Sequence, residues 1–447
     1  MFPPFNAQQV LEHAPVSHGL EVQLTPIICN DLDQLFFDRV HAFAPMVPKT
    51  RYLSLFKRPE KSRQKKCLQY AMWTLAASVS SQFHLIRMDL YAEARQLLNA
   101  LDVENQGHPC PEQVQAWILL SIYELTSNMC NYQRGMVSAG RAFRLIQLMR
   151  LNEMDGPNYA AVRACWSGQG KGQCDWIDYE SVRRTFWVAY TIDRFTSAID
   201  GLPLSFSESQ IFTRLPAPDS NFNSGRTTTT CFLPELMDGS DPERVNRGRD
   251  SSPFIQSIVV ATICGRILEH KQLPRERRQY SKQSTSENEF FREHQALKEL
   301  LTGHIKILSM SFTSMLEHPD PMLIFEALAT QMAVLMLGET IETRRTGTDT
   351  QSMQVAESLI MEHQQWSLEA VHKMSMLAAT IGQINCFQAH PFTPIPFLVS
   401  SRFCLRHLGL NDAYRNLVLG ITTALEGLSS VNGLAQSCLR QINFEHS

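Results

Sequence analysis

Apolar residues recur three or four positions apart along almost the whole chain, which is the spacing of one helical face. Segments in which apolar and polar residues alternate, as they do in strands, are nearly absent. We therefore predict an all-α fold of amphipathic helices, and the short links between them favour antiparallel neighbours. The expected helices cover residues 30–43, 63–83, 86–101, 111–125, 132–149, 180–203, 253–270, 289–310, 322–343, 353–381, 394–407 and 412–429.

The chain is too long for one ordinary core, because single hydrophobic cores stop growing near ~250–300 residues. With 447 residues, 44% of them hydrophobic, a large two-lobed helical body is expected. Asn30 or Asp31 is the predicted cap of the first helix, and the polar stretch Pro274–Asn288 is predicted to interrupt the second half. The predicted divisions are a polar lead-in (1–29), an N-terminal helical part (30–216), a linker or surface loop (217–252) and a C-terminal helical part (253–440).

Charge and cysteine usage exclude several classes of protein. A formal net charge of -3 does not suit non-specific nucleic-acid binding over the whole surface. The eleven cysteines are scattered without any Cys-x-x-Cys pair, so we interpret them as reduced core residues of an intracellular protein that binds no metal. The most apolar segment, Met322–Leu337, carries Glu326 and Gln331 and is predicted to be a core helix, so no membrane partner is expected.

One helix places a carboxylate in its apolar face. On a helix beginning near Glu180, residues Val182, Phe186, Ala189 and Ser197 fall on the same side as Asp193. A buried aspartate needs a partner or a chemical role. Glu180 and Arg184 have the i,i+4 spacing of a helical ion pair. Phe186 and Tyr190 share one face of the helix. Trp187 lies on another face, where it can pack against a second neighbouring helix.

The same helix resembles the signature of the fungal-specific transcription factor domain, the all-helical middle homology region of fungal zinc-cluster regulators. The resemblance lies in Glu-x-x-Arg-Arg-x-Phe-Trp-x-x-Tyr-x-x-Asp-Arg, followed by Gly-x-Pro. In this sequence these residues are Glu180, Arg183, Arg184, Phe186, Trp187, Tyr190, Asp193, Arg194, Gly201 and Pro203.

Further segments match the family in the expected order. The match is strongest from Asp31 to Pro216 and looser beyond it, and from Met322 onward the chain resembles regulators found beside secondary-metabolite biosynthetic genes. The matching segments are Phe36–His41 with Pro45, Tyr70–Ala77, Leu119–Glu124, Ala142–Arg144 with Leu151–Asn152, Ile211, Leu215–Pro216, Ser252–Phe254, Gly265–Ile267 and Asn385–Phe392.

The resemblance implies a nuclear regulator of RNA polymerase II genes, acting on a secondary-metabolite gene cluster through its helical domain. It implies promoter DNA as a partner, reached through another protein or through a module outside this sequence. The transcription machinery or another transcription factor, a small-molecule effector and a second copy of the chain are further candidate partners.

Family members usually carry a DNA-binding module in which six cysteines hold two zinc ions. Here Cys29 is the only cysteine before Cys67, so no cofactor or metal is expected. The chain is then either a shortened gene product or a regulator without its own zinc cluster, and DNA binding and zinc stay implications of the family.

If the chain is such a regulator, we expect Asp193 to be a structural residue that is paired with an arginine. Arg144, on the preceding helix, is the first candidate partner, with Arg141 or a contact within the helix as alternatives.

The same helix also allows the interpretation that the protein is an enzyme. Asp193, Thr196 and Asp200 have the spacing of one metal motif of helical terpene cyclases, but the aspartate-rich partner motif is missing. No other catalytic motif is present, so no catalytic residue is expected and the Mg-dependent enzyme remains a remote alternative. A nearer alternative is a helical ligand-binding or interaction protein that descends from such regulators and no longer controls transcription.

A basic run lies ahead of the second expected helix. A nuclear import signal and a solvated loop with a first helical turn are equally good interpretations of it. A second basic segment, Pro274–Lys282, is a weaker candidate. The residues of the first run are Lys57, Arg58, Lys61, Arg63, Lys65 and Lys66.

Overall fold

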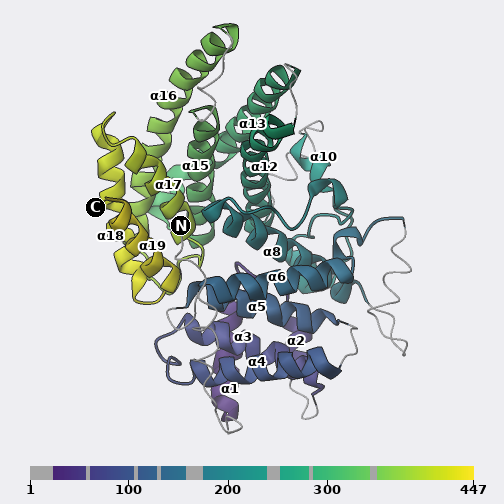
Figure 1. Ribbon diagram of the computed structural model, residues 1–447. Coiled ribbons are helices and arrows are strands. Elements are labelled where there is room, and N and C mark those ends of the chain that lie inside the picture. Colours follow the sequence, from purple (N-terminus) through teal and green to yellow (C-terminus); the bar gives the residue numbers. More distant parts are fainter. Residues whose placement is uncertain are drawn as a thin grey trace.

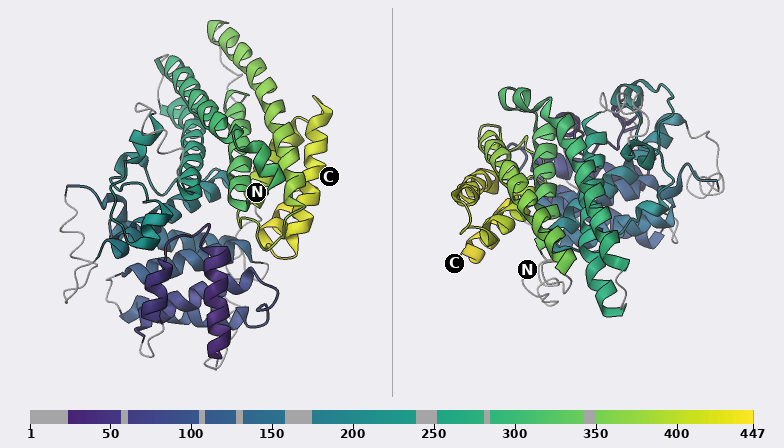
Figure 2. Two further views of the ribbon diagram at one scale, coloured as in Figure 1. Left: turned by 180° about the vertical axis from the view of Figure 1, so that it is seen from behind. Right: turned by 90° about the horizontal axis from the view of Figure 1, so that it is seen from above.

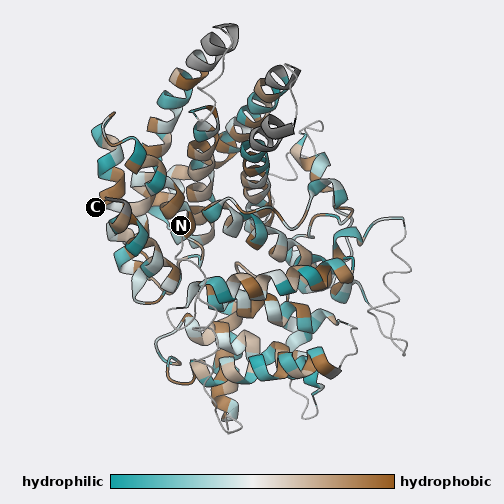
Figure 3. Cartoon of the chain, viewed as in Figure 1, coloured by the Kyte–Doolittle hydropathy of each residue, from teal (hydrophilic) through white to brown (hydrophobic). Residues whose placement is uncertain are grey.

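The computed structural model describes residues 24–56, 61–104, 109–127, 132–157, 175–238, 252–280, 285–342 and 350–446. Within these ranges every regular element is a helix, so the predicted all-α class is confirmed. Figure 3 shows apolar and polar residues on different sides of many helices, as the helical spacing of the sequence predicts.

The first half of the chain forms a compact bundle, at the bottom of Figure 1. Helices α3 and α5 lie at its centre, where α3 packs against both α4 and α5, and α5 also packs against α6. Nearly every residue of α5 is buried, as expected of a helix at the centre of a bundle. The bundle consists of α1 (Pro26–Leu35), the π-helical η1 (Phe36–Val40), α2 (Lys49–Phe56), α3 (Arg63–Ser78), α4 (Arg87–Glu104), α5 (Pro111–Thr126) and α6 (Tyr132–Leu148).

The second half forms a body of longer helices above the bundle, and Figure 2 shows the same stacking from behind. Its centre is α15, which packs against α12, α13, α16 and α17. These helices are α12 (Pro253–Tyr280), α13 (Thr285–Ser309), α14 (Phe312–Glu317), α15 (Pro321–Glu342), α16 (Thr350–Ile381), α17 (Pro394–Arg406), α18 (Asp412–Ser429) and α19 (Gly433–His446).

Helix α15 is long and apolar enough to cross a membrane by length and composition alone. Its most apolar 18-residue window is 89% buried inside the protein. It therefore serves as the core helix that the sequence predicts.

Helix α8 (Trp176–Asp200) lies between the two bodies. It packs against α5 and α6 of the bundle and against α12 and α17 of the upper body. Asp175 caps its start by accepting the amides of Ile177 and Asp178, and Gly201 ends it with a left-handed φ of 65°. One continuous cluster of buried apolar residues, from Leu32 to Ile442, joins both bodies through this helix.

Several helix boundaries differ from the predictions. The first helix begins at Pro26 because Thr25, not Asn30 or Asp31, caps it. Helix α12 continues through Pro274 to Tyr280, so the predicted interruption is shorter. Helices α2 and α19 were not expected. The chain between α6 and α12 also carries the short elements η2 (Leu151–Glu153), η3 (Glu208–Gln210), α9 (Asp219–Ser224) and α10 (Leu233–Met237).

The predicted linker is only partly described. Its first part carries α9 and α10, and Phe222 and Leu233 are buried in it. Residues 239–251 lie outside the described part of the chain. The division of the chain into 1–29, 30–216, 217–252 and 253–440 stays a prediction.

Candidate functional site

The signature helix α8 is buried around nearly its whole circumference. Every residue from Glu180 to Ile199 is buried, including the charged side chains of Arg184 and Arg194. Buried charges must be paired and hydrogen-bonded to be tolerated. The partners of these residues therefore define what the signature does.

Glu180 and Arg184 form the first buried charge cluster. Arg184 Nε donates to Glu180 Oε1 at 3.2 Å, which confirms the predicted i,i+4 pair. The same guanidinium donates to Asp219 at 2.7 Å, to the Ala217 carbonyl at 2.6 Å and to the Pro45 carbonyl at 3.3 Å. Glu180 in turn accepts the amide of Ala217 at 2.7 Å. Arg184 thus fastens two distant loops to α8.

Arg183 fastens a third segment. It donates to Glu180 at 2.6 Å and to Asp155 at 3.1 Å. Asp155 also accepts the backbone amide of Arg214 at 2.8 Å and the hydroxyl of Tyr179 at 3.1 Å. Burial opposes the charge of Arg183, but Glu180 and Asp155 outweigh it and raise the pKa of the guanidinium.

Asp193 forms the second cluster, near the end of α8. Its carboxylate accepts the backbone amide of Ser205 at 3.1 and 3.0 Å and that of Phe206 at 3.3 Å, and it pairs with Arg194 at 3.3 Å. Arg194 also donates to the Phe206 carbonyl at 2.8 Å. Burial raises the pKa of Asp193, while Arg194 and the two amides lower it in part.

The prediction that Arg144 pairs with Asp193 is wrong. Arg144 lies on the exposed side of α6, and Arg141 pairs with Asp102 instead, at 3.1 Å. The alternative of a contact within the helix is the one observed, through the adjacent Arg194. Hydrogen bonds from the Ser205–Phe206 backbone supply the remaining partners, and helical spacing alone does not predict them.

The aromatic signature residues fill the space between the clusters. Trp187 lies 5.0 Å from Phe186 and 5.1 Å from Tyr190, measured between ring centroids, and donates from Nε1 to the Arg214 carbonyl at 2.8 Å. The Tyr190 hydroxyl meets Thr262 of α12 at 2.9 Å, and the Arg194 guanidinium lies over the Tyr190 ring. Gly201 and Pro203 are exposed in the turn after α8.

Two of the three residues in the predicted metal motif already have partners, and the third, Asp200, is exposed at the end of α8. The Asp193 carboxylate is held by backbone amides, and the Thr196 hydroxyl donates to the Ile192 carbonyl at 2.7 Å. Within the described residues no group of three or more His, Cys, Asp or Glu side chains could hold a metal ion. The terpene cyclase alternative therefore has no support from the geometry, and the signature is a structural clamp.

The family's zinc ions also find no fitting donors among the described cysteines. Cys67, Cys264, Cys404 and Cys438 are buried, and burial raises the pKa of the Cys264, Cys404 and Cys438 thiols to about 12. Zinc ligation needs thiolates gathered around one ion. That the chain uses no cofactor stays a prediction.

The basic run is only partly described, because Lys57 and Arg58 lie outside the described residues. Arg63, Lys65 and Lys66 lie in the first turn of α3, and Lys61 donates to Gln69 at 2.7 Å. Burial lowers the pKa of Lys61. The nuclear import signal stays a prediction.

A cavity of about 530 Å³ lies at the junction of the two bodies, and the sequence did not predict it. We call it the junction cavity. It is lined by η1 and the turn after it, by the start of α9, by the first residues of α12 and α15, and by the loop before α17. Its volume lies in the range of ~300–1,000 Å³ that is typical of small-molecule sites. The π-helical η1 on its wall is a conformation often found at functional sites, but the sequence carries no clear signal for it.

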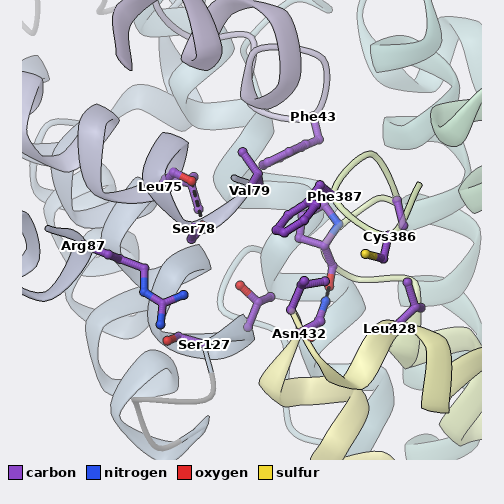
Figure 4. Close-up of a pocket in the computed structure, with 14 residues that line it drawn as sticks. Phe43, Leu75, Ser78, Val79, Arg87, Ser127, Cys386, Phe387, Leu428 and Asn432 are labelled. Atoms are coloured by element: carbon purple, nitrogen blue, oxygen red, sulfur yellow. Dashed lines mark hydrogen bonds between the residues drawn. The ribbon is translucent and has the colours of Figure 1, made fainter. Parts of the chain in front are cut away.

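Two further cavities are smaller. A cavity of about 420 Å³ lies between α10, α12 and α13. A third, shown in Figure 4, lies where α3 meets the loop around Phe387 and the turn before α19, and its volume of about 40 Å³ is too small for such a ligand. Asn432 closes its wall by donating to the Pro391 carbonyl at 2.9 Å.

Comparison with known proteins gives one family and several relatives. The family described as "Fungal specific transcription factor domain" matches residues 34–352. The chain is 37% identical over 412 residues to the pigment biosynthesis transcriptional activator pigB of Monascus ruber, covering 92% of this chain and 71% of that protein. It is 38% identical over 427 residues to the transcription factor tazR of Aspergillus terreus, covering 95% of this chain and 63% of tazR.

A third relative, the citrinin biosynthesis transcriptional activator ctnR of Monascus purpureus, is 32% identical over 416 residues, which cover 93% of this chain and 68% of ctnR. The chain thus spans about two thirds of the length of these three relatives. No solved structure matches the chain significantly.

Proposed function

Since this chain belongs to the fungal-specific transcription factor domain family, we propose that it activates a biosynthetic gene cluster for a secondary metabolite. The family and the relatives are transcription factors, so the chain is a transcription regulator and not an enzyme. One observation carries the proposal: the similarity to pigB, tazR and ctnR extends over more than nine tenths of this chain. It therefore includes helices that lie beyond the family match at residue 352.

The structure supports a regulatory rather than a catalytic body. The charged residues of the signature hold α8 to the loops at Pro45, Asp155 and Ala217. Helix α8 also packs against helices of both bodies. We propose that this shared helix couples the two bodies in the control of transcription.

We expect the chain to act in the nucleus through protein contacts. The family implies interactions with promoter DNA and with the transcription machinery, and the formal net charge of -3 disfavours tight binding of DNA by the helical body alone. A DNA-binding partner or module would then bring the body to the promoter. Purified chain that binds a promoter fragment tightly, with a steep salt dependence, would contradict this mechanism.

A tethering experiment tests the activating role. The full chain is fused to an unrelated DNA-binding domain and expressed in a fungal cell with a reporter gene that carries the matching sites. We expect reporter expression several-fold above that given by the DNA-binding domain alone. A stable, nuclear fusion that leaves the reporter at the control level would contradict an activating role for this chain.

A further inference from the structure

The junction cavity is closed by residues from both bodies. Phe43, in the turn after η1, comes from the lower bundle, whereas Phe254 of α12, Met322 of α15 and His390 come from the upper body. These four residues also line a cavity of about 20 Å³ directly behind it, against Val188 and Phe195 of α8. A molecule in the junction cavity would therefore contact the side chains that pack between α8 and the two bodies.

The inner wall of the cavity is aromatic. His390 stacks on Phe325 with ring centroids 3.7 Å apart and planes at 11°, and Phe43 meets the His390 ring edge-on at 5.6 Å. Phe254 and Met322 are buried beside them. A wall of flat rings and a polarisable thioether favours a flat, apolar ligand body.

His390 lines the cavity as an uncharged imidazole. It is only 7% exposed, and its Nδ1 accepts the backbone amide of Phe392 at 3.2 Å. The proton of the neutral ring must then lie on Nε2. Burial lowers the pKa of His390 to about 3, so the ring is neutral at physiological pH.

His41 is a second uncharged imidazole in the lining. Its Nε2 lies 3.1 Å from the Val47 carbonyl, an acceptor, so the Nε2 proton is donated there and Nδ1 keeps a lone pair. Burial, together with the nearby Arg184, lowers the pKa of His41 to about 4. Neither imidazole in the lining therefore carries a charge at physiological pH.

Acidic side chains outnumber basic ones in the described lining of the cavity. Asp38, Asp219 and Asp320 line it, together with Arg39. Arg39 donates to the Val79 carbonyl at 2.6 Å, and Asp219 pairs with Arg184. An anionic ligand would meet repulsion from this excess of carboxylates, whereas an uncharged ligand would not.

We propose that the junction cavity binds an uncharged, flat aromatic or conjugated small molecule. The aromatic wall holds the body of the ligand, and the two neutral imidazoles in the lining add no charge that would attract an anion. Because both bodies line the site, occupancy stabilises their contact across α8. The binding itself does not depend on the proposed transcriptional role, which only gives it a regulatory consequence.

Two fluorescent probes with one skeleton test the ligand class in the purified full chain. N-phenyl-1-naphthylamine is uncharged, and 8-anilinonaphthalene-1-sulfonate adds a single negative charge to it. We expect saturable one-to-one binding of the uncharged probe and at least about tenfold weaker binding of the sulfonate at the same site. Equal or tighter binding of the sulfonate would overturn the proposed ligand class.

Matched variants test the location. Ala42→Trp fills the junction cavity, and Ala296→Trp fills the cavity between α10, α12 and α13 as the control. The first should weaken binding of the uncharged probe at least about tenfold and the second should leave it unchanged. Gln388→Trp, on an exposed position of the junction cavity, repeats the test if Ala42→Trp fails to fold. Unchanged binding by a folded junction variant would overturn the site, whatever the reporter and transcript experiments show.

Discussion

The Asp193 carboxylate accepts the backbone amide of Ser205 through both of its oxygens, at 3.1 and 3.0 Å. This contact ties the turn after α8 back onto the helix and leaves Asp193 buried. Asp193→Asn replaces one acceptor oxygen with a donor that faces the same amides, and it leaves Arg194 without its ion pair. We expect a loss of about 2–4 kcal/mol in the free energy of unfolding, measured by urea denaturation.

The matched control for that variant is Asp200→Asn, at the exposed end of the same helix. Its free energy of unfolding should stay within about 0.5 kcal/mol of the wild type. If Asp193→Asn melted like the wild type and yet abolished function, the structural role of Asp193 would be disproved.

Arg184 should not tolerate even a conservative change. Lysine cannot reach Glu180, Asp219 and two carbonyls from one planar group, so Arg184→Lys leaves buried acceptors unpaired. We expect a loss of about 2–4 kcal/mol in thermal or urea unfolding. Arg144→Lys, on the exposed face of α6, should be neutral, and equal losses in both variants would refute the clamp.

Two glycines of α6 should respond in opposite directions to alanine. A Cβ at Gly135 would lie 2.7 Å from the Leu125 backbone nitrogen of α5, whereas at Gly140 it would meet no atom within 4 Å. Gly135→Ala should therefore cost about 1–3 kcal/mol through overpacking. Gly140→Ala should add about 0.5–1 kcal/mol because alanine favours the helix. Circular dichroism melts of the two variants would decide, and losses of the same size would contradict the close packing of α5 and α6.

Glu326 should make the protein less stable as the pH rises. It is fully buried in α15, accepts from Ser257 at 3.2 Å, and burial raises its pKa well above the usual value. Above the pKa of the unfolded state, near ~4.5, the unfolded chain releases this proton while the folded chain keeps it. Stability therefore falls through that window, and Glu326→Gln should remove this part of the pH dependence.

Glu339, on the same helix, provides the control of opposite sign. Burial would raise its pKa, but Lys271 and Arg406 outweigh burial and lower it. Its contribution to stability is present above the unfolded pKa and is lost on acidification, so Glu339→Gln should lower stability most at neutral pH. Urea melts of both variants should therefore extend from about pH 3 to 8. The stability of Glu326→Gln should gain on the wild type as the pH rises above about 4.5, whereas the deficit of Glu339→Gln should stay constant at higher pH and shrink as the pH falls below about 4.5. A deficit of Glu339→Gln that does not shrink on acidification, or a Glu326→Gln curve parallel to the wild type above about 4.5, would contradict the assignment.

The sequence predicts those features that depend on local spacing. The period of apolar residues places α3, α5, α6 and α15, and the i,i+4 rule predicts the Glu180–Arg184 pair. The interruption was expected too early, at Pro274, because α12 continues to Tyr280. The partner of Asp193 escaped prediction because its main ligands are backbone amides of a turn whose path depends on tertiary packing.

The junction cavity also depends on tertiary packing, so local spacing in the sequence does not predict it. Phe43, Phe254, Met322 and His390 come from four segments that meet only after both bodies have packed on α8. No periodicity or spacing relates these residues to one another. The tautomers of His41 and His390 likewise follow from the carbonyl and the amide that each ring faces in the folded chain.

We propose above all that this chain activates a biosynthetic gene cluster. Deletion of its gene in the fungus, followed by genome-wide transcript measurement under conditions in which the chain is expressed, tests it most directly. We predict that transcripts of one contiguous set of biosynthetic genes fall, and that a copy of the wild-type gene restores them. Unchanged transcripts in every clustered gene set would contradict the account and favour a helical binding protein that no longer controls transcription.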